Sequence, residues 1–134
     1  MKRYERRVRF QEVDAAGLLF FPNFLVMCHE AMEDLCDELS GGYAGLIERR
    51  RLGLPSVHVE SRFDAPLRHG DVAGIEMAVV KVGNSSLTLR YKFFREEILC
   101  AEVTQVVVCT NLDAQRSQPL PDDLRALAKE HLLG

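Results

Sequence analysis

The chain alternates between two hydrophobic periods, and the change from one to the other marks out its elements. Residues 6–11 alternate, with Val8 and Phe10 on one side, which predicts a first strand whose other face meets water. From 23 to about 39, apolar residues recur three or four positions apart, which predicts one long helix. Pro22 suits the first position of that helix, where an N–H would lack a helical partner in any case.

The apolar side of this helix covers more than half of its circumference, and acidic residues gather on the opposite side. The apolar residues are Phe24, Leu25, Met27, Cys28, Ala31, Met32, Leu35, Cys36 and Leu39. A helix this widely apolar needs a surface that wraps around it. Ser40-Gly41-Gly42 is predicted to end it.

The second half of the chain returns to strand-like alternation after a short helical segment within 43–53. Strands are predicted at Val57–Ala65, Val72–Val82, Ser86–Arg95 and Ile98–Asn111, and a short helix from Pro121 to about Leu132. Turn signals at 83–84 and 96–97 join the last three strands into an antiparallel sheet. The order predicts an α+β fold in a single domain, residues 1–134, in which a curved five-stranded antiparallel sheet covers one long helix.

Composition narrows the class of protein. The 134 residues are 47% apolar and 28% charged, which is typical of a globular domain, and the net charge of −3 argues against nucleic acid or an anionic membrane as partner. No apolar run approaches the roughly 20 residues of a membrane span, and no signal peptide is evident, so we expect a cytoplasmic protein. The four cysteines lack zinc-site spacing and are expected to be buried and reduced.

One loop carries the candidate chemistry. Asp14 stands in an otherwise almost wholly apolar run before the long helix, and a carboxylate among apolar side chains is costly to ionise without support. The backbone N–H groups at the helix start, near Phe21, are suited to stabilise an oxyanion, and Gly17 lets the backbone turn. Two interpretations stay open: Asp14 is a nucleophile or general base, or it caps an ordinary turn.

This loop and the helix after it resemble the signature of the 4-hydroxybenzoyl-CoA thioesterase family of hotdog-fold proteins. The matching residues are Asp14-x-x-Gly17-Leu18-Leu19-Phe20-Phe21-Pro22-Asn23-Phe24. The segments Pro66–Asp71, Val82–Thr88 and Ala101–Thr104 are also similar to the family, so the resemblance covers nearly the whole chain. Cys28–Ala31, Val57–Val59 and Pro119–Pro121 resemble the branch that hydrolyses 1,4-dihydroxy-2-naphthoyl-CoA in quinone synthesis.

The resemblance implies an acyl-CoA thioesterase. Asp14 occupies the position of the family's catalytic aspartate, which attacks the thioester carbonyl or activates a water. Phe21 occupies the position whose backbone N–H polarises that carbonyl, although many bacterial relatives have His or Tyr there. The family needs no metal and no organic cofactor, coenzyme A being part of the substrate. It builds its site between subunits, which implies self-association as a dimer or tetramer.

Further residues are candidates for binding the substrate. The set is Leu18, Phe20, Pro22, His58, Arg68, Asn84, Ser85 and Ser86. Leu18 and Phe20 are expected to face the acyl group or the core, and Arg68 and the serines are suited to bind the pantetheine or the phosphates. Glu30 and Glu33 either face the site or belong to a solvated acidic side of the helix. The basic run 49–51 is either a phosphate contact or a solvated loop.

Two other functions compete with thioester hydrolysis. A dehydratase on the same fold typically places a histidine near the site loop, and here none precedes His29. A non-catalytic acyl-CoA-binding or assembly protein would not need the retained Asp14 and Gly17.

Overall fold

A computed structural model describes residues 1–133. Its larger elements are β1 (Lys2–Arg7), α1 (Pro22–Cys36), α2 (Gly42–Glu48), β3 (Ser56–Phe63), β4 (Val72–Val82), β5 (Ser86–Arg95), β6 (Ile98–Val108) and α3 (Asp122–Glu130). Between them lie a 3-10 turn, η1 (Phe10–Glu12), and three two-residue strands, β2 (Leu52–Gly53), β7 (Thr110–Asn111) and β8 (Arg116–Ser117).

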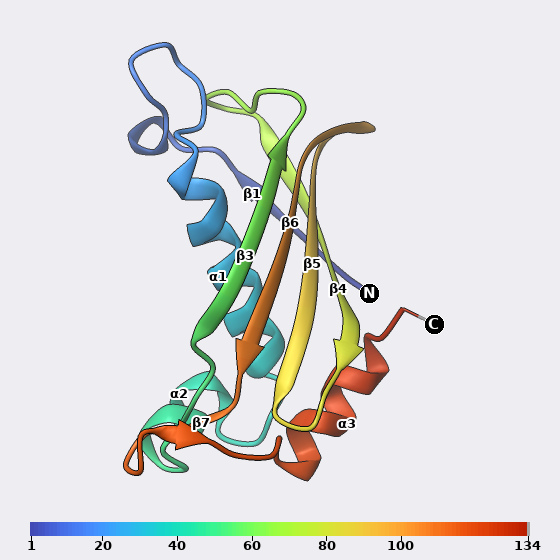
Figure 1. Ribbon diagram of the computed structural model, residues 1–134. Helices are drawn as coiled ribbons and strands as arrows, with labels where there is room; N and C mark the ends of the chain where they lie inside the picture. Colours follow the sequence, from blue (N-terminus) through green and yellow to red (C-terminus); the bar gives the residue numbers. More distant parts are fainter. Residues whose placement is uncertain (134) are drawn as a thin grey trace.

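The five long strands form one sheet in the order β1-β4-β5-β6-β3, and every neighbouring pair is antiparallel (Figure 1). Tight turns join β4 to β5 and β5 to β6, as the Gly83-Asn84 and Glu96-Glu97 signals predicted. The predicted α+β class and antiparallel sheet are thus confirmed. The small strands form a second sheet, β2-β7-β8, at one end of the molecule.

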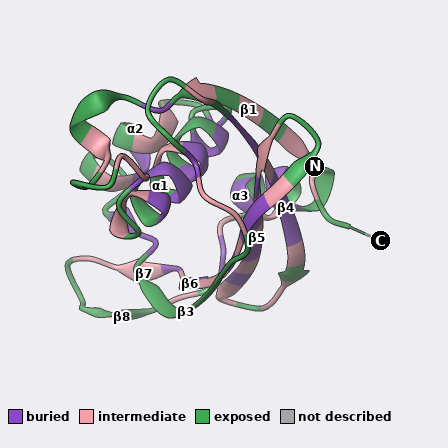
Figure 2. Cartoon of the chain, turned by 90° about the horizontal axis from the view of Figure 1, so that it is seen from above, coloured by how far each residue is buried: buried purple, intermediate pink, exposed green. Residues whose placement is uncertain are grey.

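Helix α1 lies against one face of the large sheet, and the two share one core (Figures 1 and 2). The sheet contributes the alternating residues Leu87, Leu89, Tyr91 and Phe93 of β5, all at most 3% exposed. The ring of Phe24, on α1, meets the ring of Phe93 edge-on at 5.1 Å. Burial of this apolar side, at about 25 cal/mol per Å², holds the helix on the sheet.

The long helix differs from the prediction at its C-terminal end. It begins at Pro22 as expected, but it ends at Cys36 instead of Leu39, because the N–H groups of Glu38 and Leu39 bond three residues back in a tighter turn. Leu39 stays buried, whereas Leu25, assigned to the apolar side, is 42% exposed.

The first strand also differs from the prediction. It covers Lys2–Arg7, and the chain then turns into η1, so Phe10 is 75% exposed and does not share a face with buried Val8. The cause is local: the Glu12 carboxylate accepts the Arg9 N–H at 2.8 Å, which closes the turn. Alternation by itself does not distinguish this turn from a strand.

Two residues of the basic run 49–51 form ion pairs within the chain. Arg50 makes two hydrogen bonds to Asp123, at 2.7 and 2.9 Å, and Arg51 pairs with Asp113 at 3.1 Å.

The predicted strand Ile98–Asn111 breaks at Cys109, whose N–H donates to the carbonyl of Ser85, so the last two residues of the predicted strand form β7. None of the helices in residues 1–133 has the length and apolar character of a membrane span.

Candidate functional site

The loop between η1 and α1 is tied to itself and to the neighbouring turn. The N–H of Asp14 bonds to the carbonyl of Leu18 at 2.8 Å, and the N–H of Gly17 bonds to the carbonyl of Asp14 at 2.9 Å. Gly17 has φ = +80°, the left-handed region that glycine adopts without strain. Leu18 pairs with Arg68, which joins the loop to the turn before β4. The loop therefore has a defined conformation.

The carboxylate of Asp14 takes part in an Asx-type turn. Its Oδ1 accepts hydrogen bonds from the N–H groups of Ala16, at 2.9 Å, and Leu18, at 3.1 Å. Its Oδ2 accepts none from residues 1–133. The side chain is exposed, so in the single chain it is not buried among apolar groups as the sequence suggested. The turn holds one oxygen in place and leaves the other accessible.

Phe21 immediately precedes α1. The N–H groups on both sides of it are paired: that of Phe20 with the Glu12 carbonyl at 3.0 Å, and that of Asn23 with the Phe20 carbonyl at 2.8 Å. Within residues 1–133 the N–H of Phe21 itself donates no hydrogen bond, and Pro22 has none to donate. One free N–H thus remains at the positive end of the α1 dipole. The Phe21 side chain is 62% exposed.

Phe21 also lines an apolar pocket of about 300 Å³ between the loop and the end of β3. The lining residues are Leu18, Leu19, Phe21, Phe24, Phe63, Asp64, Ala65, Pro66 and Leu67. Phe24 and Phe63 meet edge-on at 5.0 Å in its wall. Phe63 and the segment 64–67 were not among the residues selected from the sequence, because only the fold brings the end of β3 to the loop.

Asp14 and Gly17 line a separate hollow of about 490 Å³, together with Phe10, Val13, Ala15 and His69. The rings of Phe10 and His69 meet edge-on at 5.4 Å. The loop thus contributes residues to two hollows, the apolar pocket beside Phe21 and the one that Asp14 lines. Of the residues selected from the sequence, Leu18, Phe21 and Arg68 lie in this region. Phe20 is exposed beside Phe21, and Pro22 is half-buried.

The remaining predicted residues lie far from the loop within one chain. Asn84, Ser85 and Ser86 form the turn at the opposite end of the sheet, separated from the loop end by the length of β5, about 30 Å (Figure 1). His58 lies on β3, about 16 Å along the strand from Phe63, and is 3.2 Å from Glu60. Only a second copy of the chain would bring these residues to the loop.

The helix carboxylates pair with side chains of the same chain. Glu30 pairs with Arg6 at 2.9 Å, and exposed Glu33 lies 3.6 Å from His29. Neither carboxylate lines the pocket beside Phe21 or the hollow beside Asp14.

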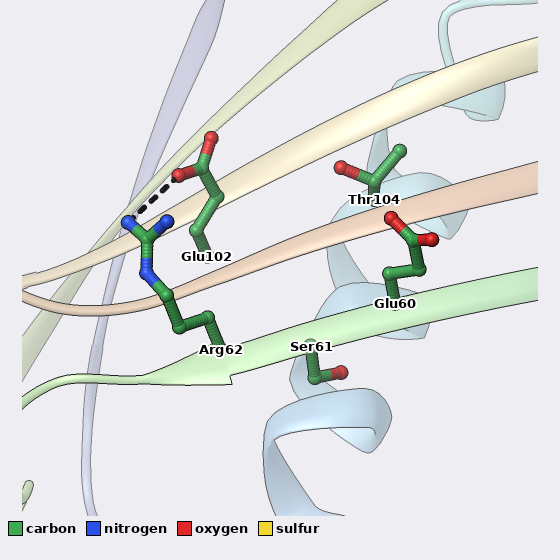
Figure 3. Close-up of a pocket in the computed structure, with 5 residues that line it drawn as sticks. All are labelled: Glu60, Ser61, Arg62, Glu102 and Thr104. Atoms are coloured by element: carbon green, nitrogen blue, oxygen red, sulfur yellow. Dashed lines mark hydrogen bonds and ion pairs between the residues drawn. The ribbon is translucent and has the colours of Figure 1, made fainter.

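A third hollow, of about 570 Å³ and lined by charged residues, lies on the outer face of the sheet (Figure 3). It is lined by Glu60, Ser61, Arg62, Glu102 and Thr104. Arg62 points toward Glu102 at 3.3 Å and also pairs with Asp64 at 3.1 Å, so its charge is neutralised within the chain.

One group of possible metal ligands occurs among residues 1–133: single ligand atoms of Glu38, Glu130 and His131 lie within 4.8 Å of one another. Lys2 already pairs with Glu38 there.

A half-buried ion pair stands at the base of the loop. Arg6 donates two hydrogen bonds to the Glu12 carboxylate, at 2.8 and 2.9 Å, and the two side chains are 23% and 12% exposed. These bonds hold the pKa of Glu12 below its usual range and raise that of Arg6, against the opposing effect of burial. Nothing in the sequence singled out Glu12, because only the fold brings its partner Arg6 to it.

Comparison with known proteins identifies the family. Residues 8–127 match the model of the thioesterase-like superfamily. The chain belongs to that superfamily. It is 31% identical, over 90% of its length and 82% of the relative's, to a 1,4-dihydroxy-2-naphthoyl-CoA hydrolase of Nostoc punctiforme. A hydrolase of the same name from Thermosynechococcus vestitus is 30% identical over 96% of this chain and 89% of its own.

Solved structures agree with this assignment. A 1,4-dihydroxy-2-naphthoyl-CoA thioesterase from Synechocystis superimposes with a TM-score of 0.87 at 28% identity, covering 96% of this thioesterase-like chain and 95% of its own. A gentisyl-coenzyme A thioesterase gives a TM-score of 0.84 at 29% identity, with 92% and 99% covered. The predicted family, and with it the enzyme class of CoA-thioester hydrolases, is confirmed.

Proposed function

We propose that this protein hydrolyses the thioester of an aromatic acyl-CoA, of the hydroxynaphthoyl kind, to the free acid and coenzyme A. The observation that carries the proposal is the free N–H of Phe21, a residue that lines the apolar pocket and follows the Asp14 loop. A thioester carbonyl seated there would receive a hydrogen bond from a backbone donor at a helix N-terminus. The names of the relatives supply the substrate class.

The chemistry requires a nucleophile and a stabilised oxyanion. The Asp14 carboxylate attacks the carbonyl carbon, or it takes a proton from a water that attacks. Negative charge then develops on the carbonyl oxygen beside the Phe21 N–H, and collapse of that intermediate breaks the C–S bond and releases the CoA thiolate. By the first route, water then hydrolyses the anhydride that links the acyl group to Asp14. Both routes consume one water for each thioester.

The pocket suits a flat aromatic group. Phe21, Phe24 and Phe63 all contribute to its wall, and aromatic rings gain about 0.5–1.5 kcal/mol from edge-on or offset contacts beyond the burial of apolar area. We assign Leu18, Phe20 and Pro22 to this acyl side of the site, and Arg68 to the side that CoA enters.

The exposed edge of the sheet supports a site shared by two subunits in a hotdog arrangement, with the sheet curved around α1. All eight residues of β3 are exposed, and its outer edge has no strand partner within residues 1–133. An unpaired edge on which Val57 is 62% exposed and Val59 is 41% exposed favours pairing with the same edge of a second copy of the chain. Such a copy would carry His58 and the 84–86 turn toward the loop of its partner.

The test measures release of free thiol from 1,4-dihydroxy-2-naphthoyl-CoA, benzoyl-CoA and a fatty acyl-CoA by the wild type and by Asp14→Asn. We expect hydrolysis that falls at least about 100-fold in the variant while binding of CoA is retained. Asp113→Asn, an exposed aspartate paired with Arg51 at the other end of the molecule, is the matched control and should keep full activity.

Each outcome bears on the proposal. Equal rates for the wild type and Asp14→Asn would show that the Asp14 carboxylate serves only its turn. Binding of acyl-CoA without hydrolysis of any thioester would favour an acyl-CoA-binding protein instead.

A further inference from the structure

Arg6 joins three segments that lie far apart in the sequence. Its guanidinium donates to both oxygens of Glu12, at 2.8 and 2.9 Å, and contacts both oxygens of Glu30 on α1, at 2.9 and 3.3 Å. Arg6 itself belongs to β1. One side chain thus links the first strand, the base of the loop and the long helix.

Glu12 in turn holds both ends of the Asp14 loop. Its carboxylate accepts the N–H of Arg9 at 2.8 Å, and its carbonyl accepts the N–H of Phe20 at 3.0 Å and the side-chain amide of Asn23 at 2.9 Å. Asp14 follows two residues later in the chain, and Phe21 follows Phe20 directly. The position of Glu12 therefore sets where the loop starts and where it returns to the helix.

Stability alone is a poor reason for this arrangement. A half-buried ion pair pays a desolvation penalty that offsets much of its attraction, and apolar residues of similar volume are often as stable. A bidentate arginine–carboxylate pair fixes the relative orientation of the two side chains, because two parallel hydrogen bonds hold the guanidinium and the carboxylate in a common plane. The value of the pair thus lies in geometry.

We propose that the Arg6–Glu12 pair, anchored by Glu30, positions the Asp14 carboxylate relative to the free N–H of Phe21. The proposal rests on the thioesterase function proposed above. Neither side chain lines the pocket beside Phe21 or the hollow beside Asp14, so both act as positioning residues through the loop. Displacing reacting groups by about 1 Å costs on the order of 100-fold in rate, whereas binding of CoA along the surface does not depend on that distance.

The test compares Glu12→Gln and Arg6→Gln with the wild type. We expect kcat to fall about 10- to 100-fold, with KM and the Kd for CoA within about 2-fold. Glu12→Asp keeps the charge but shortens the reach, and we expect it to recover only part of the rate. Arg3→Gln is the matched control, since Arg3 lies on the same strand as Arg6 and likewise joins two carboxylates, those of Glu5 on β1 and Glu76 on β4.

A second readout does not depend on activity. Hydrogen exchange, followed residue by residue by NMR, should speed up about 10-fold or more at the Phe20 amide in Glu12→Gln. The Leu19 amide bonds to Leu67 instead, at 2.7 Å, and should change much less. This measurement also indicates whether the variants remain folded.

The outcomes separate this inference from the proposed function. Wild-type kcat in both glutamine variants, or equal acceleration of exchange at Phe20 and Leu19, would overturn the positioning role. A wild type that hydrolyses no thioester would overturn the proposed function, and the exchange measurement would still test whether Glu12 orders the loop.

Discussion

Gly17 provides the sharpest test of how the loop is built. Its φ of +80° lies in the left-handed region, and a Cβ added there would meet no atom within 4 Å. Gly17→Ala therefore introduces no clash, and its cost comes from the backbone alone. That cost is about 1–2 kcal/mol for an L-residue in this region, reduced by about 0.4–1 kcal/mol because alanine also restricts the unfolded chain. The net destabilisation should be about 1 kcal/mol.

The effect on catalysis should exceed the effect on stability. Relaxation of the strain at residue 17 would disturb the bond from its N–H to the Asp14 carbonyl and shift the carboxylate. We expect kcat to fall about 10-fold or more, while Tm falls by only about 4 °C.

The assay pairs thermal unfolding with thioester hydrolysis, and Gly41→Ala is the matched control. Gly41 has φ = +84°, its added Cβ would make only ordinary contacts at 3.6 Å or more, and it precedes α2, away from the loop. It should lose similar stability and keep its activity. Unchanged kcat in Gly17→Ala, or an equal loss in Gly41→Ala, would refute the reasoning.

Further predictions follow from other contacts. Arg50→Gln should lower the free energy of unfolding by less than about 1 kcal/mol, because the side chains of Arg50 and Asp123 are 34% and 44% exposed. It should also leave KM for acyl-CoA unchanged, and a large rise in KM would indicate that the basic run contacts the substrate. Val59→Lys should shift sedimentation from dimer or tetramer toward monomer, and an unchanged mass would contradict association through β3. Burial raises the pKa of Cys36 to about 12 and that of Cys28 as well, so a thiol reagent should label neither until the protein is denatured. The pKa of Glu12 is lowered in the folded protein, so its pairing with Arg6 stabilises the fold above the ordinary carboxyl pKa, and this stabilisation is lost as the pH falls through the lowered pKa. The urea midpoint of Glu12→Gln should therefore lie below that of the wild type at about pH 7, and the difference should shrink as the pH falls to about 3.

The sequence by itself determined the elements whose signals are local. The bounds of β4 and β5 agree with the predicted ranges, and Pro22 marks the start of α1. The same local chemistry indicated a backbone turn at Gly17 and a helix start near Phe21, and it offered an Asx turn as one of two interpretations of Asp14. Periods of two and of 3.6 residues, and the dihedral preferences of glycine and proline, need no knowledge of distant contacts.

Only the tertiary structure decided what depends on contacts between distant segments. It turned Phe10 outward in a 3-10 turn, brought Phe63 to the pocket beside Phe21, and paired the basic run with aspartates. It also joined Arg6, Glu12 and Glu30 into one cluster. These outcomes were beyond the sequence because a charged or aromatic side chain has many possible partners, and the register of strands and the path of the chain select one.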